Sequence, residues 1–414
     1  MYKFAHGRIH ALDAVRSTAM MLGVLMHASG AFIPNNLPIA LAQLSVDSLP
    51  FVLVQYLHIF RMPCFFLVAG FVGRLLLYQR GTAGFIRNRR DRILIPLILS
   101  WLLFIPMMTY VRIWKRTVEN AMAARTPQIS PWHATLSAFT TGEVFHDGIP
   151  LEHLWFLYEL IFIYVLVLCL RWMCGRWAAA GRIGDIAFRA LIESWLGAIV
   201  IAAPLTVALY RTQQYMDYRG LPILGVARLA VDKPILLAYG TFFLIGWFLC
   251  RQPDLLGIIE RRALLSTAVG IVAGAWPLVL IAHTANRTGI QPTAIEKLSY
   301  GAAYGLAMVL MSFGFVGIFL RWLSEHNKVV RYLSDSAYWI YLAHLPLVRA
   351  LQVALYPWSV HWSIKIGLIT LSSLAMLLFS YQFLVRYSWI GVMLSGPRTA
   401  PKTLKARDYA EATV

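Results

Sequence analysis

The sequence predicts an all-α protein, a polytopic membrane helix bundle of about ten transmembrane helices with both termini in the cytoplasm. Apolar residues make up 59% of the chain, charged residues only 14%, and the mean hydropathy is +0.64. These values differ widely from those of a soluble globular protein. A helix needs about 20 apolar residues to cross a bilayer. Segments of this kind occur near residues 12–32, 50–78, 93–114, 151–171, 193–210, 233–250, 263–283, 298–321, 335–355 and 362–390.

The distribution of Lys and Arg predicts the orientation of these segments. With the N-terminus inside, the cytoplasmic side receives 23 of the 37 Lys and Arg residues, the opposite side receives 10, and four lie within segments. Cytoplasmic loops collect basic residues, so this asymmetry places both termini inside. The same rule explains the formal charge of +18 without nucleic acid as a partner. Residues 1–396 are expected to form one integral-membrane domain, and residues 397–414 a short, basic, disordered cytoplasmic tail.

The first segment carries three ionisable groups on one face. On a helix that turns about 100° per residue, Arg16 points within about 20° of His27, and Asp13 points within about 40° of it. His27 lies roughly 16 Å along the axis from Arg16. Because the segment has no small-residue cleavage site, we expect a retained helix rather than a signal peptide. Such a line of polar groups predicts a cavity. The alternative is a structural polar network in which Arg16 extends to the inner interface.

His27 is the strongest candidate for chemistry in this segment, because it sits well inside the span or near its far end. An imidazole titrates near neutrality. It is therefore the side chain best suited to accept a proton from an alcohol.

The second segment contains His58 and Arg61, which are three residues apart and share a face. A buried arginine is costly unless it is paired, so Arg61 is expected to face the same cavity as Asp13 or Glu152. A helix-packing ion pair is the alternative interpretation.

A basic cluster at the start of the third segment contains Arg89 and Arg92. Their three-residue spacing places them on one face, where two planar guanidinium groups can clasp phosphates. Basic clusters in this position also set topology or contact anionic lipid.

The fourth and ninth segments begin with aromatic and titratable residues. Glu152, His153 and Trp155 lie at the start of the fourth, where a belt of interfacial aromatic residues would explain Trp155 but not the acid. Tyr341 and His344 share a face of the ninth segment.

Several classes of function are excluded by missing motifs. The sequence has no phosphate-binding loop of the nucleoside-triphosphatase type, no dinucleotide-binding glycine pattern and no zinc signature. Its four cysteines form no close pair of the zinc type and predict no disulfide framework. We therefore expect neither a metal nor a nucleotide-driven transport cycle.

Five motifs in the sequence resemble those of the membrane acyltransferase family three, and within it the glucan biosynthesis protein C branch. They occur in family order and span about residues 12–390. They are Leu12-Asp13-Ala-Val-Arg16 followed by His27, Phe60-Arg61-Met62 leading into Phe65-Phe66-Leu-Val-Ala-Gly70, Arg89-x-x-Arg92, His153-Leu-Trp155-Phe156-Leu, and Tyr338-Trp-Ile-Tyr341-Leu-Ala-His344-Leu-Pro346.

The resemblance implies a multi-pass enzyme of the bacterial inner membrane that uses acyl-CoA as co-substrate. Such an enzyme moves the acyl group to a hydroxyl of an extracytoplasmic glycan. In the glucan branch the donor is succinyl-CoA and the acceptor is an osmoregulated periplasmic glucan; acetyl-CoA is the other donor to consider. The family's Arg-x10-His pair falls on Arg16 and His27, and its Arg-x-x-Arg motif falls on Arg89 and Arg92.

Residue chemistry and resemblance together give one expected mechanism. Arg89 and Arg92 bind the coenzyme phosphates, while His27, oriented by Asp13 or Glu152, takes the proton of the acceptor hydroxyl. Arg16 or Arg61 stabilises the oxyanion or holds the distal carboxylate of a succinyl group. The remaining candidates for binding substrate are His58, His153, Trp155, Tyr341 and His344.

Several alternatives stay open at this point. His27 either acts as a base or is itself acylated. A secondary transporter of a small anion or a sugar-linked substrate would use the same buried charges as a relay. A homo-oligomer is compatible with the sequence.

Overall fold

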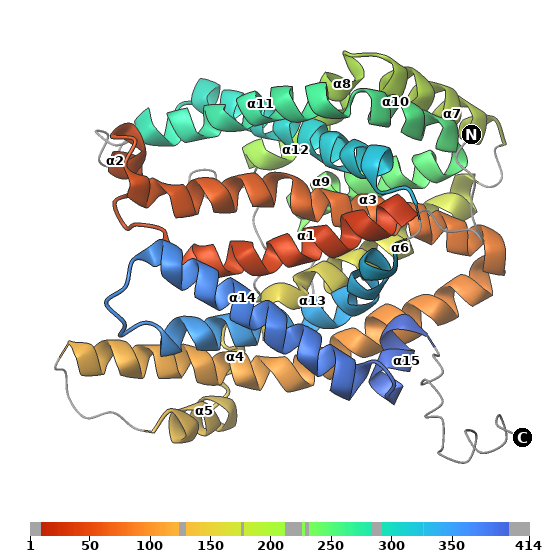
Figure 1. The fold of residues 1–414 in the computed structure, drawn as a ribbon. Coiled ribbons are helices and arrows are strands. Elements are labelled where there is room, and N and C mark those ends of the chain that lie inside the picture. The colour runs from red at the N-terminus through yellow and green to blue at the C-terminus, as the bar shows by residue number, and fades with distance from the viewer. Residues whose placement is uncertain are drawn as a thin grey trace, which may run out of the picture.

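The computed structural model describes residues 10–123, 130–174, 178–211, 226–227, 232–283, 292–325 and 327–396 as a helical bundle (Figure 1). Its α-helices are α1 (His10–Ser29), α2 (Leu37–Ala42), α3 (Leu49–Arg89), α4 (Ile95–Met122), α5 (Pro131–Thr140), α6 (Trp155–Cys174), α7 (Ala178–Glu193), α8 (Gly197–Arg211), α9 (Lys233–Arg251), α10 (Leu256–Arg261), α11 (Ala263–His283), α12 (Ala294–Trp322), α13 (Lys328–Ala354), α14 (Trp362–Ser380) and α15 (Trp389–Ser395). Two π-helical segments, η3 (Arg90–Leu94) and η8 (Tyr381–Val385), follow α3 and α14. The expected tail, 397–414, lies outside the described residues.

The all-α membrane class is confirmed, but a count of ten crossings is not. Six helical segments of the described chain are long and apolar enough to cross a membrane, or seven if the bent pair α7 and α8 is one span. One of the six, Val46–Met122, includes two of the predicted segments. Gly81 breaks it with a φ of 64°, a backbone conformation that favours glycine. Figure 1 shows the chain turning back near this break, so that α4 returns past the bundle.

Two helices that carry candidate residues, α1 and α13, are not among the six. Both lie in the middle of the bundle in Figure 1, where α1 packs against α13, α3 and α14. The charged residues that lower their hydropathy, such as Asp13 and Arg16 of α1, are held between helices. Both helices therefore pack against other helices of the bundle. The polar residues at these contacts lower their mean hydropathy.

Glycines allow α3 and α9 to approach backbone to backbone. A Cβ atom added at Gly70 would collide with the carbonyl group of Phe243, and one added at Gly246 would collide with the carbonyl group of Leu67. Small residues at such contacts let membrane helices pack closely. This contact fixes α3, which forms one wall of the site described below.

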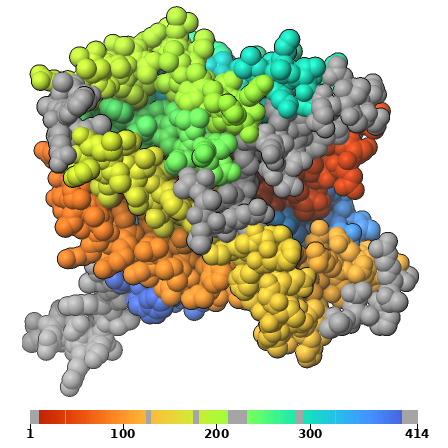
Figure 2. Space-filling view, turned by 180° about the vertical axis from the view of Figure 1, so that it is seen from behind, coloured from red at the N-terminus to blue at the C-terminus, as the bar shows by residue number. Residues whose placement is uncertain are grey.

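The remaining short elements lie at the ends of the bundle. The two-residue strands β1 (Ile149–Pro150) and β2 (Val226–Ala227) pair in antiparallel register. In Figure 2, α5 forms a projection at the lower right of the molecule. In Figure 1, α15 lies at the side of the molecule where α1 begins. The placement of both termini in the cytoplasm stays a prediction.

Candidate active site

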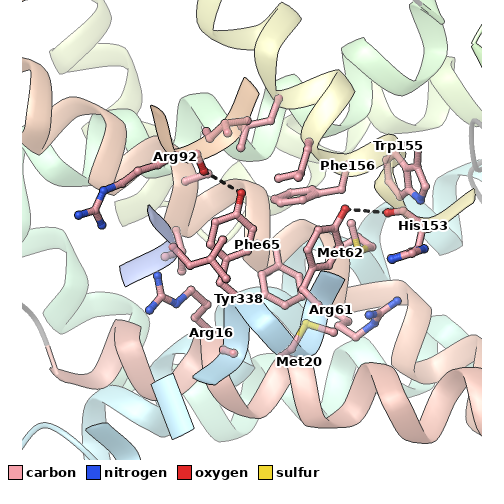
Figure 3. A pocket seen from close by; sticks show the side chains of 18 of the residues that line it. Arg16, Met20, Arg61, Met62, Phe65, Arg92, His153, Trp155, Phe156 and Tyr338 are labelled. Carbon is pink, nitrogen blue, oxygen red and sulfur yellow. Dashed lines mark hydrogen bonds between the residues drawn. The ribbon is translucent and has the colours of Figure 1, made fainter. Parts of the chain in front are cut away.

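A single cavity of about 580 Å³ contains eleven of the twelve candidate site residues. Its walls come from α1, α3, η3, α6 and α13, with Leu394 of α15 at one edge. The eleven residues are Arg16, His27, His58, Arg61, Arg89, Arg92, Glu152, His153, Trp155, Tyr341 and His344. Figure 3 shows Arg16 and Arg92 on one side of this cavity and Arg61, His153 and Trp155 on the other.

One side of the cavity, the arginine end, is lined by Arg16, Arg80, Arg89 and Arg92. Arg89 donates hydrogen bonds from Nη1 to the hydroxyl of Tyr164 at 2.9 Å and from Nη2 to Asn88 Oδ1 at 2.7 Å. Neither partner is a carboxylate, so the positive charge of Arg89 is not neutralised by these bonds. The arginine end is therefore suited to bind an anion.

The π-helical segment η3 sets the position of Arg92. A π-helix leaves the regular α-helical hydrogen-bond pattern and is frequent at functional sites. Here the hydroxyl of Tyr338, on α13, donates a hydrogen bond of 2.7 Å to the backbone carbonyl of Arg92 (Figure 3). Gly396 directly follows α15, and a Cβ atom added to it would lie 2.9 Å from Arg92 Nη2. The end of α15 therefore lies beside the guanidinium group of Arg92.

Asp13 is the one candidate that does not line the cavity. Ser334 of α13 connects it to Arg16: Arg16 Nη2 donates to Ser334 Oγ at 2.9 Å, and Ser334 Oγ donates to Asp13 Oδ1 at 3.3 Å. This group joins the first turns of α1 to α13. His27 lies at the other end of α1, and the structure does not bring Asp13 to it. The expectation that Asp13 orients His27 therefore has no support in the geometry.

The opposite side of the cavity holds three neighbouring imidazole rings, which we call the imidazole cluster: His27, His153 and His344. The ring centroids of His27 and His344 are 5.1 Å apart, and those of His153 and His344 are 5.3 Å apart. The hydroxyl of Tyr341 donates to the backbone carbonyl of His153 at 2.7 Å and so ties α13 to the start of α6. The three rings come from α1, from the turn before α6 and from α13.

Arg61 lies beside the imidazole cluster and is 5% exposed. Gly23 of α1 makes room for it, because a Cβ atom there would collide with the guanidinium group. In the described part of the chain, Arg61 donates to Met26 Sδ at 3.4 Å, and its Nε has no hydrogen-bond partner. Arg349 also lines the cavity and acts electrostatically on His27. The cationic groups around His27 suit a site at which negative charge develops.

Glu152 is held at the edge of the cavity by an ion pair with Arg112 of α4. Its φ of 49° is unusual for a residue other than glycine. Strained backbone of this kind is frequent at functional sites. Arg61 and Glu152 line the same cavity, as the sequence predicts. Among the ion pairs of the described residues, Glu152 is paired with Arg112 and not with Arg61.

Apolar side chains line the cavity between its two ends. Phe65 and Ala69 contribute from α3, and Phe156 and Leu160 from α6. In Figure 3, Phe65 lies between the arginine end and the residues around His153. We call this part the waist of the cavity.

Sequence reasoning missed three residues of the site. Tyr338 stood in a motif but was not a candidate, and Tyr164 gave no signal beyond being a tyrosine in an apolar helix. Arg349 could have been found, since the argument used for Arg61, a charge inside an apolar segment, applies to it equally.

No group of three His, Cys, Asp or Glu side chains is placed to hold a metal ion within the described ranges.

Comparison with known proteins agrees with the resemblance that the motifs indicate. The family model described as "Acyltransferase domain" matches residues 9–385. "Glucans biosynthesis protein C" of Escherichia coli O6:K15:H31 (strain 536 / UPEC) is 24% identical over 412 residues, which cover 98% of each chain. The protein of the same name from Escherichia coli (strain K12) gives the same values. No solved structure gives a significant match. Because the family model covers nearly the whole chain, the protein belongs to this family of membrane acyltransferases.

Proposed function

We propose that this protein transfers an acyl group from acyl-CoA, bound on the cytoplasmic side of the bacterial inner membrane, to a hydroxyl of an extracytoplasmic glycan. The observation that carries the proposal is the cavity that contains both the arginine end and the imidazole cluster. An anionic donor can bind at one end while its thioester reaches basic groups at the other. The names of the relatives favour a glucan as the acceptor.

In this proposal the arginine end binds the phosphates of the donor. Arg89 and Arg92 offer planar, permanently charged groups that suit phosphate oxygens. Arg16 stands at the same end and is anchored to Ser334, so it contributes positive charge from a fixed position. The pantetheine arm then passes the waist, where Phe65 and Ala69 give it an apolar path.

The chemical step takes place beside His27. Its imidazole removes the proton of the acceptor hydroxyl as the hydroxyl oxygen attacks the thioester carbonyl carbon. The carbon–sulfur bond then breaks, and the leaving thiolate takes the proton from the imidazolium, so that the products are an ester and free coenzyme A. Arg61 lies on the same cavity and stabilises the oxyanion of the tetrahedral intermediate.

We propose succinyl-CoA as the first donor to test and acetyl-CoA as the second. With a succinyl donor, one of the cationic groups near His27 would hold the distal carboxylate, and Arg61 is the buried candidate for this role. Arg61 cannot fully stabilise both the carboxylate and the oxyanion. Removing Arg61 should therefore lower the rate of acyl transfer by different factors with the two donors.

The test is acyl transfer by the purified protein in lipid vesicles with radiolabelled succinyl-CoA and a glucan oligosaccharide. We expect thiol release that depends on the acceptor, together with label covalently attached to the oligosaccharide. Movement of intact label across the vesicle without thiol release would instead identify a transporter.

A further inference from the structure

His344 lines the cavity, and hydrogen bonds to the backbone fix its tautomer. Its Nδ1 lies 2.7 Å from the carbonyl oxygen of Tyr341 and 3.1 Å from that of Ile340. Carbonyl oxygens only accept hydrogen bonds, so Nδ1 carries the hydrogen. In the neutral ring, Nε2 is then an acceptor alone. This atom is buried and has no partner within the described residues.

In His153 the roles of the two ring nitrogens are exchanged relative to His344. Its Nε2 lies 2.8 Å from the carbonyl oxygen of Leu342 and therefore carries the hydrogen. Its Nδ1 is the acceptor, and this atom too is buried without a partner in the part of the chain that the structure describes. The side chains are only 6% and 1% exposed for His153 and His344, respectively, so bulk water does not solvate these atoms freely.

Two neighbouring acceptors without donors favour a ligand that supplies two hydrogen-bond donors. Buried polar groups are almost always hydrogen-bonded. The two rings are 5.3 Å apart between centroids, so one small molecule can contact both. The ligand must offer two donors and no strong positive charge, because Arg61 and Arg349 already stand nearby. A sugar with adjacent hydroxyl groups meets these conditions.

We infer that His153 Nδ1 and His344 Nε2 form the hydroxyl-binding subsite for the acceptor glycan. Each atom accepts a hydrogen bond from one hydroxyl of a single sugar, and this orients the reacting hydroxyl toward His27. The inference rests on the proposed function, which it deepens by assigning acceptor binding to two residues. His153 and His344 are binding residues here, and the transferred proton stays with His27.

The opposite tautomers of the two rings allow a crossed test with amide side chains. An Asn amide occupies the place of Nδ1, and a Gln amide reaches the place of Nε2. His344→Gln therefore keeps an acceptor at the cavity, whereas His344→Asn removes it. At His153 the relation is reversed: His153→Asn keeps the acceptor, and His153→Gln removes it.

The measurement is the KM for a glucan oligosaccharide and for the acyl-CoA donor in each of the four variants. We expect His344→Asn and His153→Gln to raise the acceptor KM by on the order of ten- to a hundredfold. We expect the acceptor KM of His344→Gln and of His153→Asn to stay within about fivefold of the wild-type value. The loss is smaller because these variants leave no sugar hydroxyl without a hydrogen-bond partner. The donor KM of all four should change by less than about twofold, which also shows that each variant is folded.

The crossed pattern separates hydrogen bonding from packing or proton transfer. If Asn and Gln have equal effects at each position, or if kcat falls while the acceptor KM does not change, the inference is wrong. Its failure is distinct from that of the proposed function. A wild-type protein that transfers label while the crossed pattern is absent overturns the subsite alone, whereas a wild-type protein that releases no thiol overturns both.

Discussion

Removing Arg89 or Arg92 should weaken donor binding, while removing Arg90 between them should not. Arg89 and Arg92 line the cavity. Arg90 does not line it; its side chain is 60% exposed and forms an ion pair with Asp91 at 2.8 Å. Arg89→Ala, Arg92→Ala and Arg90→Ala each remove one positive charge from the same stretch of the chain. The three variants therefore differ in cavity contact rather than in net charge.

The size of the effect follows from the kind of bond that is lost. A hydrogen bond to a charged group contributes about 1.5 to 3 kcal/mol. At about 1.4 kcal/mol per tenfold, this corresponds to a rise in donor KM of roughly 10- to 150-fold for Arg89→Ala or Arg92→Ala. For Arg90→Ala we expect less than about a threefold change, because exposed ion pairs contribute about 0 to 1 kcal/mol.

Initial rates measured with two donors provide the assay and its control. The first donor is succinyl-CoA, and the second is succinyl-pantetheine, which lacks the nucleotide phosphates. The loss caused by Arg89→Ala or Arg92→Ala should appear with succinyl-CoA and largely disappear with succinyl-pantetheine. The reasoning is refuted if Arg90→Ala is as damaging as Arg89→Ala, or if both donors lose activity equally.

Three further predictions concern the rest of the site and its support. His27→Ala should lower kcat by on the order of a hundredfold or more with little change in donor KM, as single-turnover acyl transfer would show; full activity would remove its role as base. Ala69→Trp should block the waist and abolish transfer while the purified variant still binds coenzyme A in equilibrium titration; unimpaired transfer would contradict a path through the waist. Gly70→Ala should destabilise the protein by about 1 to 3 kcal/mol, since its Cβ meets the Phe243 carbonyl, whereas Gly240→Ala on α9 should be neutral or stabilising in thermal unfolding; equal effects would contradict the close packing of α3 and α9.

Local patterns predicted where the polar residues lie along each helix. The spacing of Arg16 and His27 on one face of a helix agrees with their common place on the cavity wall. The same holds for two pairs with three-residue spacing, Tyr341 with His344 and Arg89 with Arg92, because both members of each pair line the cavity. These relations depend only on helical periodicity, which a sequence contains.

Contacts between distant parts of the chain could not be predicted in this way. Asp13 shares a face of α1 with His27, but it bonds to Ser334, which is 321 residues away along the chain. His153 precedes α6 and His344 lies in α13, and no periodicity in the sequence reveals that these parts of the chain are neighbours. The ten predicted segments outnumber the six spans because two of them lie in Val46–Met122, α1 and α13 are too polar, and α8 has only 15 residues.

The most direct test of the central claim is an experimental structure of the protein with a non-hydrolysable succinyl-CoA analogue. We predict that the phosphates lie against Arg89 and Arg92, that the pantetheine arm passes Phe65 and Ala69, and that the carbonyl carbon of the acyl group lies beside His27. Phosphates bound away from the arginine end, or an acyl group that lies outside the cavity against lipid, would contradict a single cavity that joins donor and acceptor.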